Sequence, residues 1–264
     1  ARRWINVAGF NFQPSEFAKI ALILYETYIL TKLTKFSMRL LDVLYVLFLP
    51  TVIATVLVLL EPDLGSSLIF VAISLGTYFA AGGSMWHFLL MIPIVLAAAI
   101  VAIVREPYRL ARLKSFLDPN FDPLGASYQI NQIIAAIAAG GLLGVGIGAS
   151  RGKFDFIPEV QSDAIFAVVA EEFGFIGALV IIGLLLFLIS RAIAIARGAR
   201  DFEGKILAVG LIILLASQSI LNLASIVVLI PLTGIPLPFI SYGGSSLLLM
   251  MTSLGILLSI RRLS

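Results

Sequence analysis

The sequence predicts an all-α membrane protein whose helices cross the bilayer several times. Of its 264 residues, 60% are hydrophobic and 12% are charged, whereas average soluble chains carry about 25% charged residues. The charges lie mostly at the ends of long apolar segments. A spanning helix needs about 20 mostly apolar residues. Seven segments approach this requirement, at residues 14–31, 43–60, 64–82, 86–104, 164–190, 206–230 and 245–260.

Composition also excludes several classes of function. The net charge of +3 is small and gives no support to nucleic-acid binding. The chain has no cysteine, which excludes disulfides and thiolate chemistry. Its single histidine, His87, excludes a metal site built from several histidines. Because the chain begins without a methionine or a signal peptide, we expect it to be part of a longer protein.

The helix predicted over residues 14–31 is the most polar of the seven. Pro14 suits its first turn, where no backbone N–H donor is needed. Glu16 and Lys19 lie three residues apart, so on a helix they can neutralise each other. The next polar feature, Glu61–Gly65, separates the second and third helices, and we expect it to be a solvated turn at a membrane face.

Residues 128–148 resemble an eighth spanning helix because they are uncharged. They also contain five glycines and begin with polar residues such as Gln129. Basic residues favour the cytoplasmic side of a membrane. The main basic clusters of this chain lie at residues 32–39, 191–205 and 261–262. These clusters share one side only if residues 128–148 do not cross the bilayer.

The resulting topology is a single membrane domain over residues 1–264 with one large external loop over residues 105–162. We expect residues 128–148 to form a re-entrant or surface helix within that loop. Irregular backbone is tolerated at membrane depth only where it packs on protein or lines a wet cavity. Loops of this length are usually functional rather than simple connections.

The external loop leads into the next helix through a stretch crowded with charges. Asp163 stands directly before an apolar run. A carboxylate in this position can cap a helix, or it can act as a general base at the membrane–water boundary. Glu171 and Glu172 lie one to two turns deeper, where they either contact lipid headgroups or face a cavity.

Basic residues in the loop suggest that it binds an anion. Arg109 and Arg112 are spaced to share one helix face, and Lys153 follows the glycine-rich segment. Guanidinium groups bind phosphate in a bidentate manner. These residues therefore suit a lipid-linked phosphate, although ordinary loop charges would give the same pattern.

The segment over residues 234–246 cannot form a regular helix, because it contains two prolines and a Gly-Gly pair. It is either a linker between helices or backbone that lines a polar cavity, with hydroxyl groups such as those of Ser241 and Ser245. In the preceding helix, Gln218 and Asn222 lie four residues apart, and we expect them to bind another helix.

Six motifs together resemble the SEDS family (shape, elongation, division, sporulation), the peptidoglycan glycosyltransferases that include RodA, FtsW and SpoVE. The motifs are QPSEFAK (13–19), EPDLG (61–65), YRLARLKSFLDP (108–119), YQINQ (128–132), IPEVQSDAIFAVVAEEFGFIG (157–177) and PLPFISYGGSS (236–246). They occur in family order over nearly the whole chain, and the last two favour the FtsW/SpoVE branch. Family members usually have ten spans, so the seven predicted here would be the last seven.

The resemblance implies that the protein polymerises lipid II on the outer face of the bacterial cytoplasmic (inner) membrane. Asp163 matches the family's essential aspartate and is the predicted general base of an inverting glycosyltransferase. A divalent cation, Mg²⁺ or Mn²⁺, is an alternative to basic residues for holding the diphosphate, with Asp155 or Glu159 as possible ligands. The residues that we expect to bind substrate are Arg109, Arg112, Lys153, Glu159, Lys19, Glu16, Gln129, Ser241 and Ser245.

The partners implied by the resemblance are lipid II, a glycan linked to undecaprenyl diphosphate, and a class B penicillin-binding protein (a transpeptidase) in the membrane. One alternative function is a flippase or transporter of the lipid-linked precursor, and another is a scaffold without turnover. Transport sites usually lie at the midplane between structural repeats. Here the charges gather at the outer face and no internal repeat is visible, which favours the enzyme.

Overall fold

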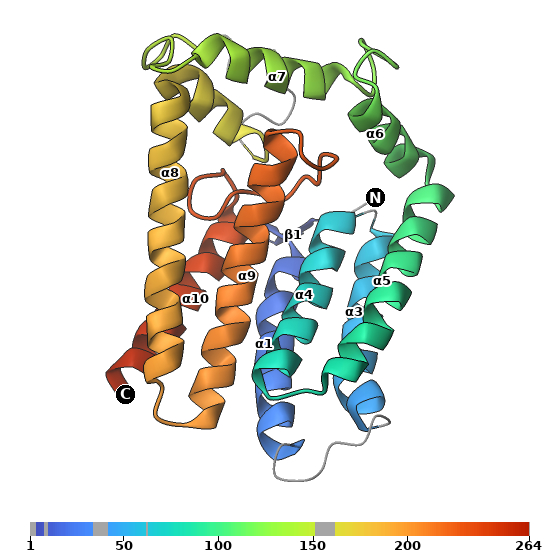
Figure 1. The fold of residues 1–264 in the computed structure, drawn as a ribbon, viewed down its shortest axis with the longest axis vertical. Helices are drawn as coiled ribbons and strands as arrows, with labels where there is room; N and C mark the ends of the chain where they lie inside the picture. Colours follow the sequence, from blue (N-terminus) through green and yellow to red (C-terminus); the bar gives the residue numbers. More distant parts are fainter. Residues whose placement is uncertain (1–3, 8–9, 34–41, 62, 151–161, 264) are drawn as a thin grey trace. The chain divides into compact units, whose positions relative to one another are not determined.

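The computed structural model is helical over most of the described chain (Figure 1). It describes residues 4–7, 10–33, 42–61, 63–150 and 162–263. The prediction of an all-α protein is confirmed for this part of the chain. Contacts divide the residues into two compact units. The first unit comprises Ala1–Leu96, Leu188–Ser217 and Gly244–Ser264, and the second comprises Ala97–Phe187 and Gln218–Gly243. A single membrane domain over residues 1–264 stays a prediction.

The first unit opens with a short antiparallel hairpin that the sequence did not predict. β1 (Ile5–Val7) pairs with β2 (Phe10–Phe12). The first long helix, α1 (Pro14–Leu33), follows directly. The ring of Phe12 stacks on that of Phe17 with 4.3 Å between centroids, so the hairpin packs on the beginning of α1.

The helices of the first unit pack closely around α1. A π-helical turn, η1 (Val43–Phe48), runs into α3 (Leu49–Leu60), and α4 (Leu64–Ala80) packs against both α1 and α3. Gly76 of α4 permits a close approach, because a Cβ atom there would lie 2.2 Å from the Cδ1 atom of Ile213. Small residues at such contacts are typical of helix packing in membranes.

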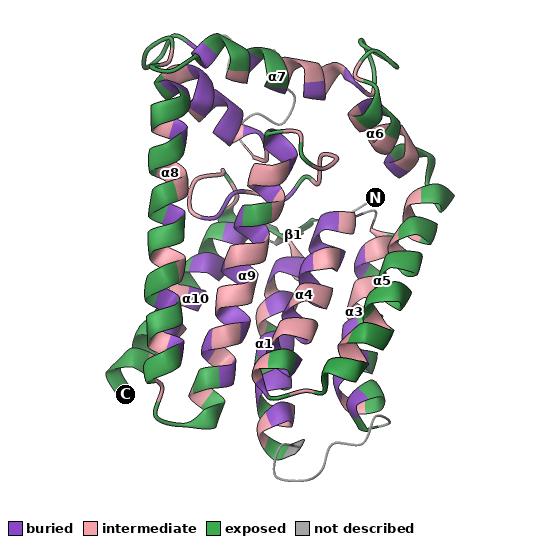
Figure 2. Cartoon of the chain, in the orientation of Figure 1, coloured by how far each residue is buried: buried purple, intermediate pink, exposed green. Residues whose placement is uncertain are grey.

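α5 (Met85–Arg105) differs from its neighbours because none of its residues is buried (Figure 2). It is nevertheless strongly apolar. A helix that is apolar and exposed along its whole length suits a lipid environment.

The second unit contains α6 (Pro107–Leu117), α7 (Tyr128–Gly140) and the first part of α8 (Ile165–Gly198). α7 lies across the beginning of α8 (Figure 1). Its 13 residues give a length of about 20 Å, and this is too short to cross the bilayer. Residues 128–148 therefore do not form a spanning helix.

The backbone after α7 is bonded to a break in α8. Gly174 interrupts α8 with a φ of 66°. Around it, the N–H of Val145 donates to the carbonyl of Glu171 at 2.9 Å, and the N–H of Phe175 donates to the carbonyl of Gly141 at 2.9 Å. Polar backbone groups that the break exposes thus find partners in the glycine-rich loop.

Two helices complete the chain, α9 (Phe202–Ile226) and α10 (Gly244–Leu263). α9 begins and ends four residues earlier than residues 206–230, the range that the sequence predicts. Its first turn accommodates Glu203, since an acidic side chain is favourable near a helix N-terminus.

Helices occupy all seven predicted segments, and five of them are long and apolar enough to cross a membrane. The five are Val43–Leu60, Met85–Arg105, Ile165–Gly198, Phe202–Ile226 and Gly244–Leu263. Of the other two, α4 has 17 residues, and α1 carries the charged side chains of Glu16, Lys19 and Glu26. Within the described chain, five spans are thus supported, and the count of seven stays a prediction.

Candidate active site

Asp163 lies in the turn that leads into α8. The helix begins at Ile165, so Ala164 occupies the N-cap position and Asp163 lies one residue before it. The interpretations of Asp163 as a helix cap and as a general base both stay predictions. Its carboxylate lies near a turn in the segment that follows α9.

That turn is at Gly234, and the carboxylate of Asp163 and the guanidinium of Arg112 both lie near it. A Cβ atom on Gly234 would lie 3.8 Å from Oδ2 of Asp163 and 3.8 Å from Nη1 of Arg112. The two charged atoms are therefore separated by at most twice this distance. Gly234 has a φ of 71°, which glycine adopts without strain. A base and a cation thus face one small space.

Arg112 is held in place by two contacts within the second unit. Its Nη1 donates to the carbonyl of Leu232 at 2.8 Å. The guanidinium carbon lies 4.6 Å from the centroid of the Tyr108 ring, on the same helix. The first contact uses one of the five guanidinium N–H groups, so the rest of the planar group can serve a ligand.

Arg109 has a different environment from Arg112, although the sequence predicted a shared role. Its side chain is buried, and Nη1 donates to the carbonyl of Ala102 near the end of α5 at 2.9 Å. This bond connects α6 to the preceding helix. We therefore assign Arg109 a structural contact, and its role in substrate binding stays a prediction.

Asn222 connects the two loops that carry the site. Its Nδ2 donates to the carbonyl of Asp163 at 2.8 Å and to the carbonyl of Ile235 at 2.7 Å, and the residue is fully buried. The prediction that Asn222 binds another helix is wrong, because its amide satisfies loop backbone instead. A buried amide in an apolar helix was the only sequence signal for this role.

The other predicted residues of the second unit lie as follows. The N–H of Leu237 donates to Oγ of Ser241 at 2.8 Å, so this hydroxyl stabilises the irregular segment after α9. Gln129 lies partly exposed in the first turn of α7. Glu171 is buried and accepts a hydrogen bond from Ser150 at 2.5 Å, which contradicts contact with lipid headgroups. The predictions for Lys153 and Glu159, together with Asp155, lie outside the described residues.

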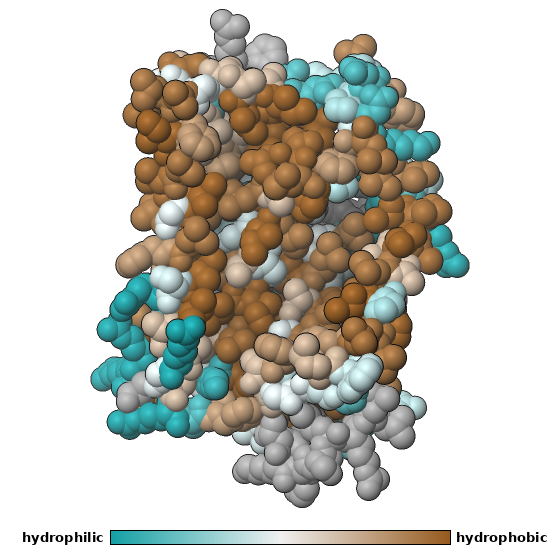
Figure 3. All heavy atoms as spheres, viewed as in Figure 1, coloured by the Kyte–Doolittle hydropathy of each residue, from teal (hydrophilic) through white to brown (hydrophobic). Residues whose placement is uncertain are grey.

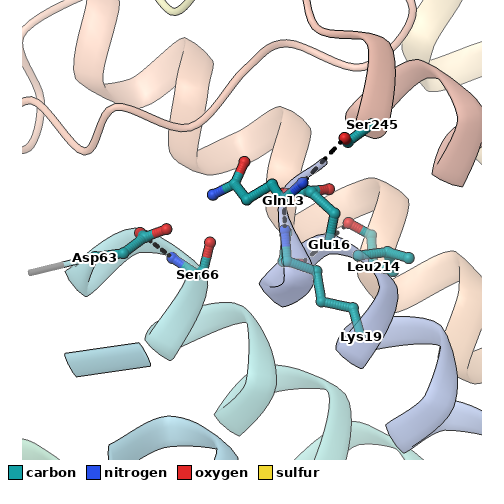
Figure 4. Close-up of polar contacts among 8 residues, drawn as sticks. Gln13, Glu16, Lys19, Asp63, Ser66, Leu214 and Ser245 are labelled. Atoms are coloured by element: carbon teal, nitrogen blue, oxygen red, sulfur yellow. Dashed lines mark hydrogen bonds and ion pairs between the residues drawn. The ribbon is translucent and has the colours of Figure 1, made fainter. Parts of the chain in front are cut away.

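The first unit holds a second polar group (Figure 4). Nζ of Lys19 lies 2.6 Å from Oε1 of Glu16, and the two side chains are 0% and 2% exposed. The predicted neutralising pair therefore forms, but deep in the protein. Nearby, the backbone N–H of Gln13 donates to Oγ of Ser245 at 3.2 Å. Ser245 belongs to the first turn of α10.

The turn before α4 is also more buried than predicted. Asp63 is 7% exposed and caps α4, since its Oδ1 accepts a hydrogen bond from the N–H of Ser66 at 2.9 Å (Figure 4). The prediction of a solvated turn is therefore wrong for Asp63. Capping of this kind typically contributes about 1 kcal/mol to helix stability.

A divalent-cation site is not formed by the described residues. No three carboxylate or imidazole side chains among them gather in a geometry that could hold a metal ion. The candidate ligands from the sequence, Asp155 and Glu159, lie outside the described residues. The expectation of Mg²⁺ or Mn²⁺ stays a prediction.

Comparison with known proteins places this arrangement in a family. A family model for FtsW, RodA and SpoVE, described as a cell cycle protein, matches residues 1–264. The chain belongs to the FtsW/RodA/SpoVE family. The resemblance inferred from the six motifs is therefore confirmed.

Relatives with curated names support the FtsW/SpoVE branch of the family. Stage V sporulation protein E of Bacillus subtilis is 41% identical over 268 residues, which cover 100% of this chain and 72% of that protein. The probable peptidoglycan glycosyltransferase FtsW of Trichlorobacter lovleyi is 41% identical over 261 residues, which cover 98% of this chain and 68% of that protein.

Solved structures of the FtsW/RodA/SpoVE family have a similar fold. A chain from a peptidoglycan synthase complex, solved to show how polymerization and crosslinking are coordinated, matches with a TM-score of 0.78 and 29% identity over 99% of this chain and 73% of that one. The rod shape determining protein RodA of Thermus thermophilus matches with a TM-score of 0.69 and 29% identity over 99% of this chain and 69% of that one.

Proposed function

We propose that this protein is a peptidoglycan glycosyltransferase that polymerises lipid II at the outer face of the bacterial cytoplasmic membrane. The observation that carries the proposal is the approach of the Asp163 carboxylate and the Arg112 guanidinium to Gly234. Glycosyl transfer from a diphosphate needs a base for the attacking hydroxyl and a cation for the leaving group. The names of the FtsW relatives support the same reaction class.

In the proposed reaction, Asp163 accepts the proton of the 4-hydroxyl of GlcNAc on the acceptor lipid II. The hydroxyl oxygen attacks C1 of the terminal MurNAc on the donor strand and inverts that centre. The bond from C1 to the undecaprenyl diphosphate oxygen breaks, and the electron pair leaves with the diphosphate. Arg112 binds the charge that develops there, because a planar guanidinium matches phosphate oxygens.

Backbone contacts supply the preorganisation that such a site needs. Asn222 fixes the carbonyl of Asp163, and Arg112 is itself fixed by the carbonyl of Leu232. Catalytic groups held in place before substrate binds need no reorganisation during the reaction. Asn222 therefore acts as a positioning residue, through the backbone of Asp163.

The proposed topology places seven spans in the membrane and residues 105–162 outside it, with α7 on or in the outer surface. A class B penicillin-binding protein is the proposed partner, supported by the peptidoglycan synthase complex among the structural matches. The Glu16–Lys19 pair and Ser245 form a second candidate group for binding substrate. Transport of the precursor is the alternative function, and the names of the curated relatives favour polymerisation.

The purified protein, mixed with its transpeptidase partner and lipid II in detergent, tests the proposal. We expect glycan strands on a polyacrylamide gel, and we expect them to disappear when a muramidase is added. A parallel assay follows a fluorescent lipid II across liposome membranes. Translocation without strand formation would contradict the proposed function and support the transporter.

A further inference from the structure

A small cavity lies at the end of the first unit where α8 and α10 finish. Its volume is about 140 Å³, and its lining consists of Arg191, Ala194, Ile195, Gly198 and Arg261. One water molecule takes about 30 Å³ in the liquid, so the cavity can hold a group larger than a single water. It combines two guanidinium groups from different helices with an apolar wall.

The positions of the two arginines along their helices match the thickness of a membrane. Arg191 follows Gly174, the break in α8, by 17 residues, and Arg261 follows Gly244, the first residue of α10, by the same number. At 1.5 Å per residue each lies about 26 Å along its straight helix, close to the roughly 30 Å thickness of the hydrocarbon core. Lipid phosphates lie just beyond that boundary. Arginine side chains reach them with the charged end in the headgroup layer and the stem along apolar surface.

The surroundings of the cavity carry more basic than acidic side chains, and the acidic ones include Glu203 in the first turn of α9. Hydrophilic side chains gather where α8 and α10 end and α9 begins, beside the apolar flanks of the helices (Figure 3). The basic residues at this end are Arg191, Arg197, Arg200, Lys205, Arg261 and Arg262. Among the described residues, neither Arg191 nor Arg261 forms an ion pair with a carboxylate. Asp201, an acidic residue of the connecting turn, caps α9 by accepting a hydrogen bond from the N–H of Gly204 at 3.0 Å.

We propose that this cavity binds the phosphodiester headgroup of an anionic phospholipid. Arg191 and Arg261 bind the phosphate oxygens from two sides, and Ala194 and Ile195 contact the apolar start of the lipid. Gly198 adds no side chain that would fill the space. Basic pockets between membrane helices are known to select anionic headgroups. A simple surplus of basic residues would orient the protein in the membrane without selecting a lipid. The cavity favours selective lipid binding over orientation alone, because it offers a defined space for one headgroup.

Native mass spectrometry of the purified protein in detergent tests this proposal by titration with phosphatidylglycerol, and phosphatidylcholine is the neutral comparison. The variant Arg191→Ala/Arg261→Ala removes both cations of the cavity. The matched control Arg197→Ala/Arg262→Ala removes the same charge from the same two helices but from residues that do not line it. We expect the apparent Kd for phosphatidylglycerol to rise roughly 30-fold in the cavity variant and less than about threefold in the control.

Several outcomes would overturn the proposal. Equal weakening in both variants would mean that diffuse charge attracts the lipid, and equal binding of the two lipids by wild type would mean that no anionic headgroup is selected. Inorganic phosphate is titrated separately. If inorganic phosphate displaced phosphatidylglycerol at equal concentration, the ligand would be free phosphate.

Thermal unfolding shows whether the alanine variant is folded. If it is not folded, the variant Arg191→Lys/Arg261→Lys replaces it. This pair keeps the charge and loses bidentate geometry, so we expect roughly tenfold weaker binding, and unchanged binding would contradict the proposal.

Discussion

The two polar groups of this protein hold opposite charges in different ways. In the first unit, Glu16 and Lys19 contact each other directly and are almost fully buried. In the second unit, Asp163 and Arg112 both approach Gly234. The Asn222 side chain donates to the backbone carbonyl of Asp163, and Arg112 donates to the backbone carbonyl of Leu232. The buried pair is thus held by its own opposite charges, whereas Arg112 and the backbone of Asp163 are held by neighbouring groups. The following predictions test this difference, beginning with the largest expected effect.

Loss of one member of the buried pair should mainly affect stability. In Glu16→Gln the ammonium group of Lys19 loses its charged partner inside the protein, and such changes cost about 3–5 kcal/mol. We expect a large fall in the thermal unfolding temperature in detergent. The double variant Glu16→Gln/Lys19→Met removes both charges and should recover much of that loss. A stable Glu16→Gln variant without activity would support the proposed role of the pair in binding substrate over a role in stability.

Arg112 should show the opposite behaviour. Arg112→Ala removes the cation that faces the departing diphosphate, and loss of one such electrostatic contact typically lowers kcat about 100-fold or more. Its unfolding temperature should change much less than that of Glu16→Gln. Strand formation from lipid II measures the rate. Arg112→Lys is the conservative variant, and we expect it to recover only part of the activity, because lysine cannot bind phosphate in a bidentate manner. Normal kcat in Arg112→Ala would contradict its role.

Asn222 tests whether positioning through the backbone matters for catalysis. Asn222→Asp keeps the size of the side chain but replaces its N–H donor with a carboxylate oxygen. That oxygen would face the carbonyls of Asp163 and Ile235 without a hydrogen to donate. We expect kcat to fall about tenfold with little change in KM, since a lost buried hydrogen bond costs about 1–3 kcal/mol. Ser225→Ala is the matched control. The hydroxyl of Ser225 is also buried, but it donates to the backbone carbonyl of Asn222 within α9, at 2.8 Å, and contacts neither loop carbonyl that Asn222 binds. Asn222→Gln should restore part of kcat. Equal effects of Asn222→Asp and Ser225→Ala would assign Asn222 to helix packing alone.

Gly234 should give the smallest effect. Gly234→Ala places a methyl group between Asp163 and Arg112, where both charged atoms are 3.8 Å away, so nothing must move. A positive φ costs about 1–2 kcal/mol with a side chain. Gly82→Ala carries the same kind of strain at φ 84° with nothing within 4 Å. We expect similar losses of stability in both variants and a severalfold loss of activity, measured on lipid II, only in Gly234→Ala. Equal activities would show that substrate does not use this space.

The sequence predicts the helices well because the bilayer fixes their length and composition. It missed the β1–β2 hairpin, since strands of three residues give almost no periodic signal. Asp163 and Arg112 were identified from residue type and family resemblance. Their common position beside Gly234 was not predicted, because it depends on the backbone of residues far away in the chain. The same reason hid the role of Asn222, whose partner Asp163 lies 59 residues away.

The central claim is that Asp163 is the general base of a glycosyltransferase. Its most direct test is the rate of lipid II polymerisation by Asp163→Asn, which keeps the size of the side chain and removes its basicity. Asp201→Asn is the control, because it makes the same chemical change at a carboxylate that caps α9. We predict no glycan strands from folded, partner-bound Asp163→Asn and a normal rate from Asp201→Asn. Strands at the wild-type rate from Asp163→Asn would contradict the claim.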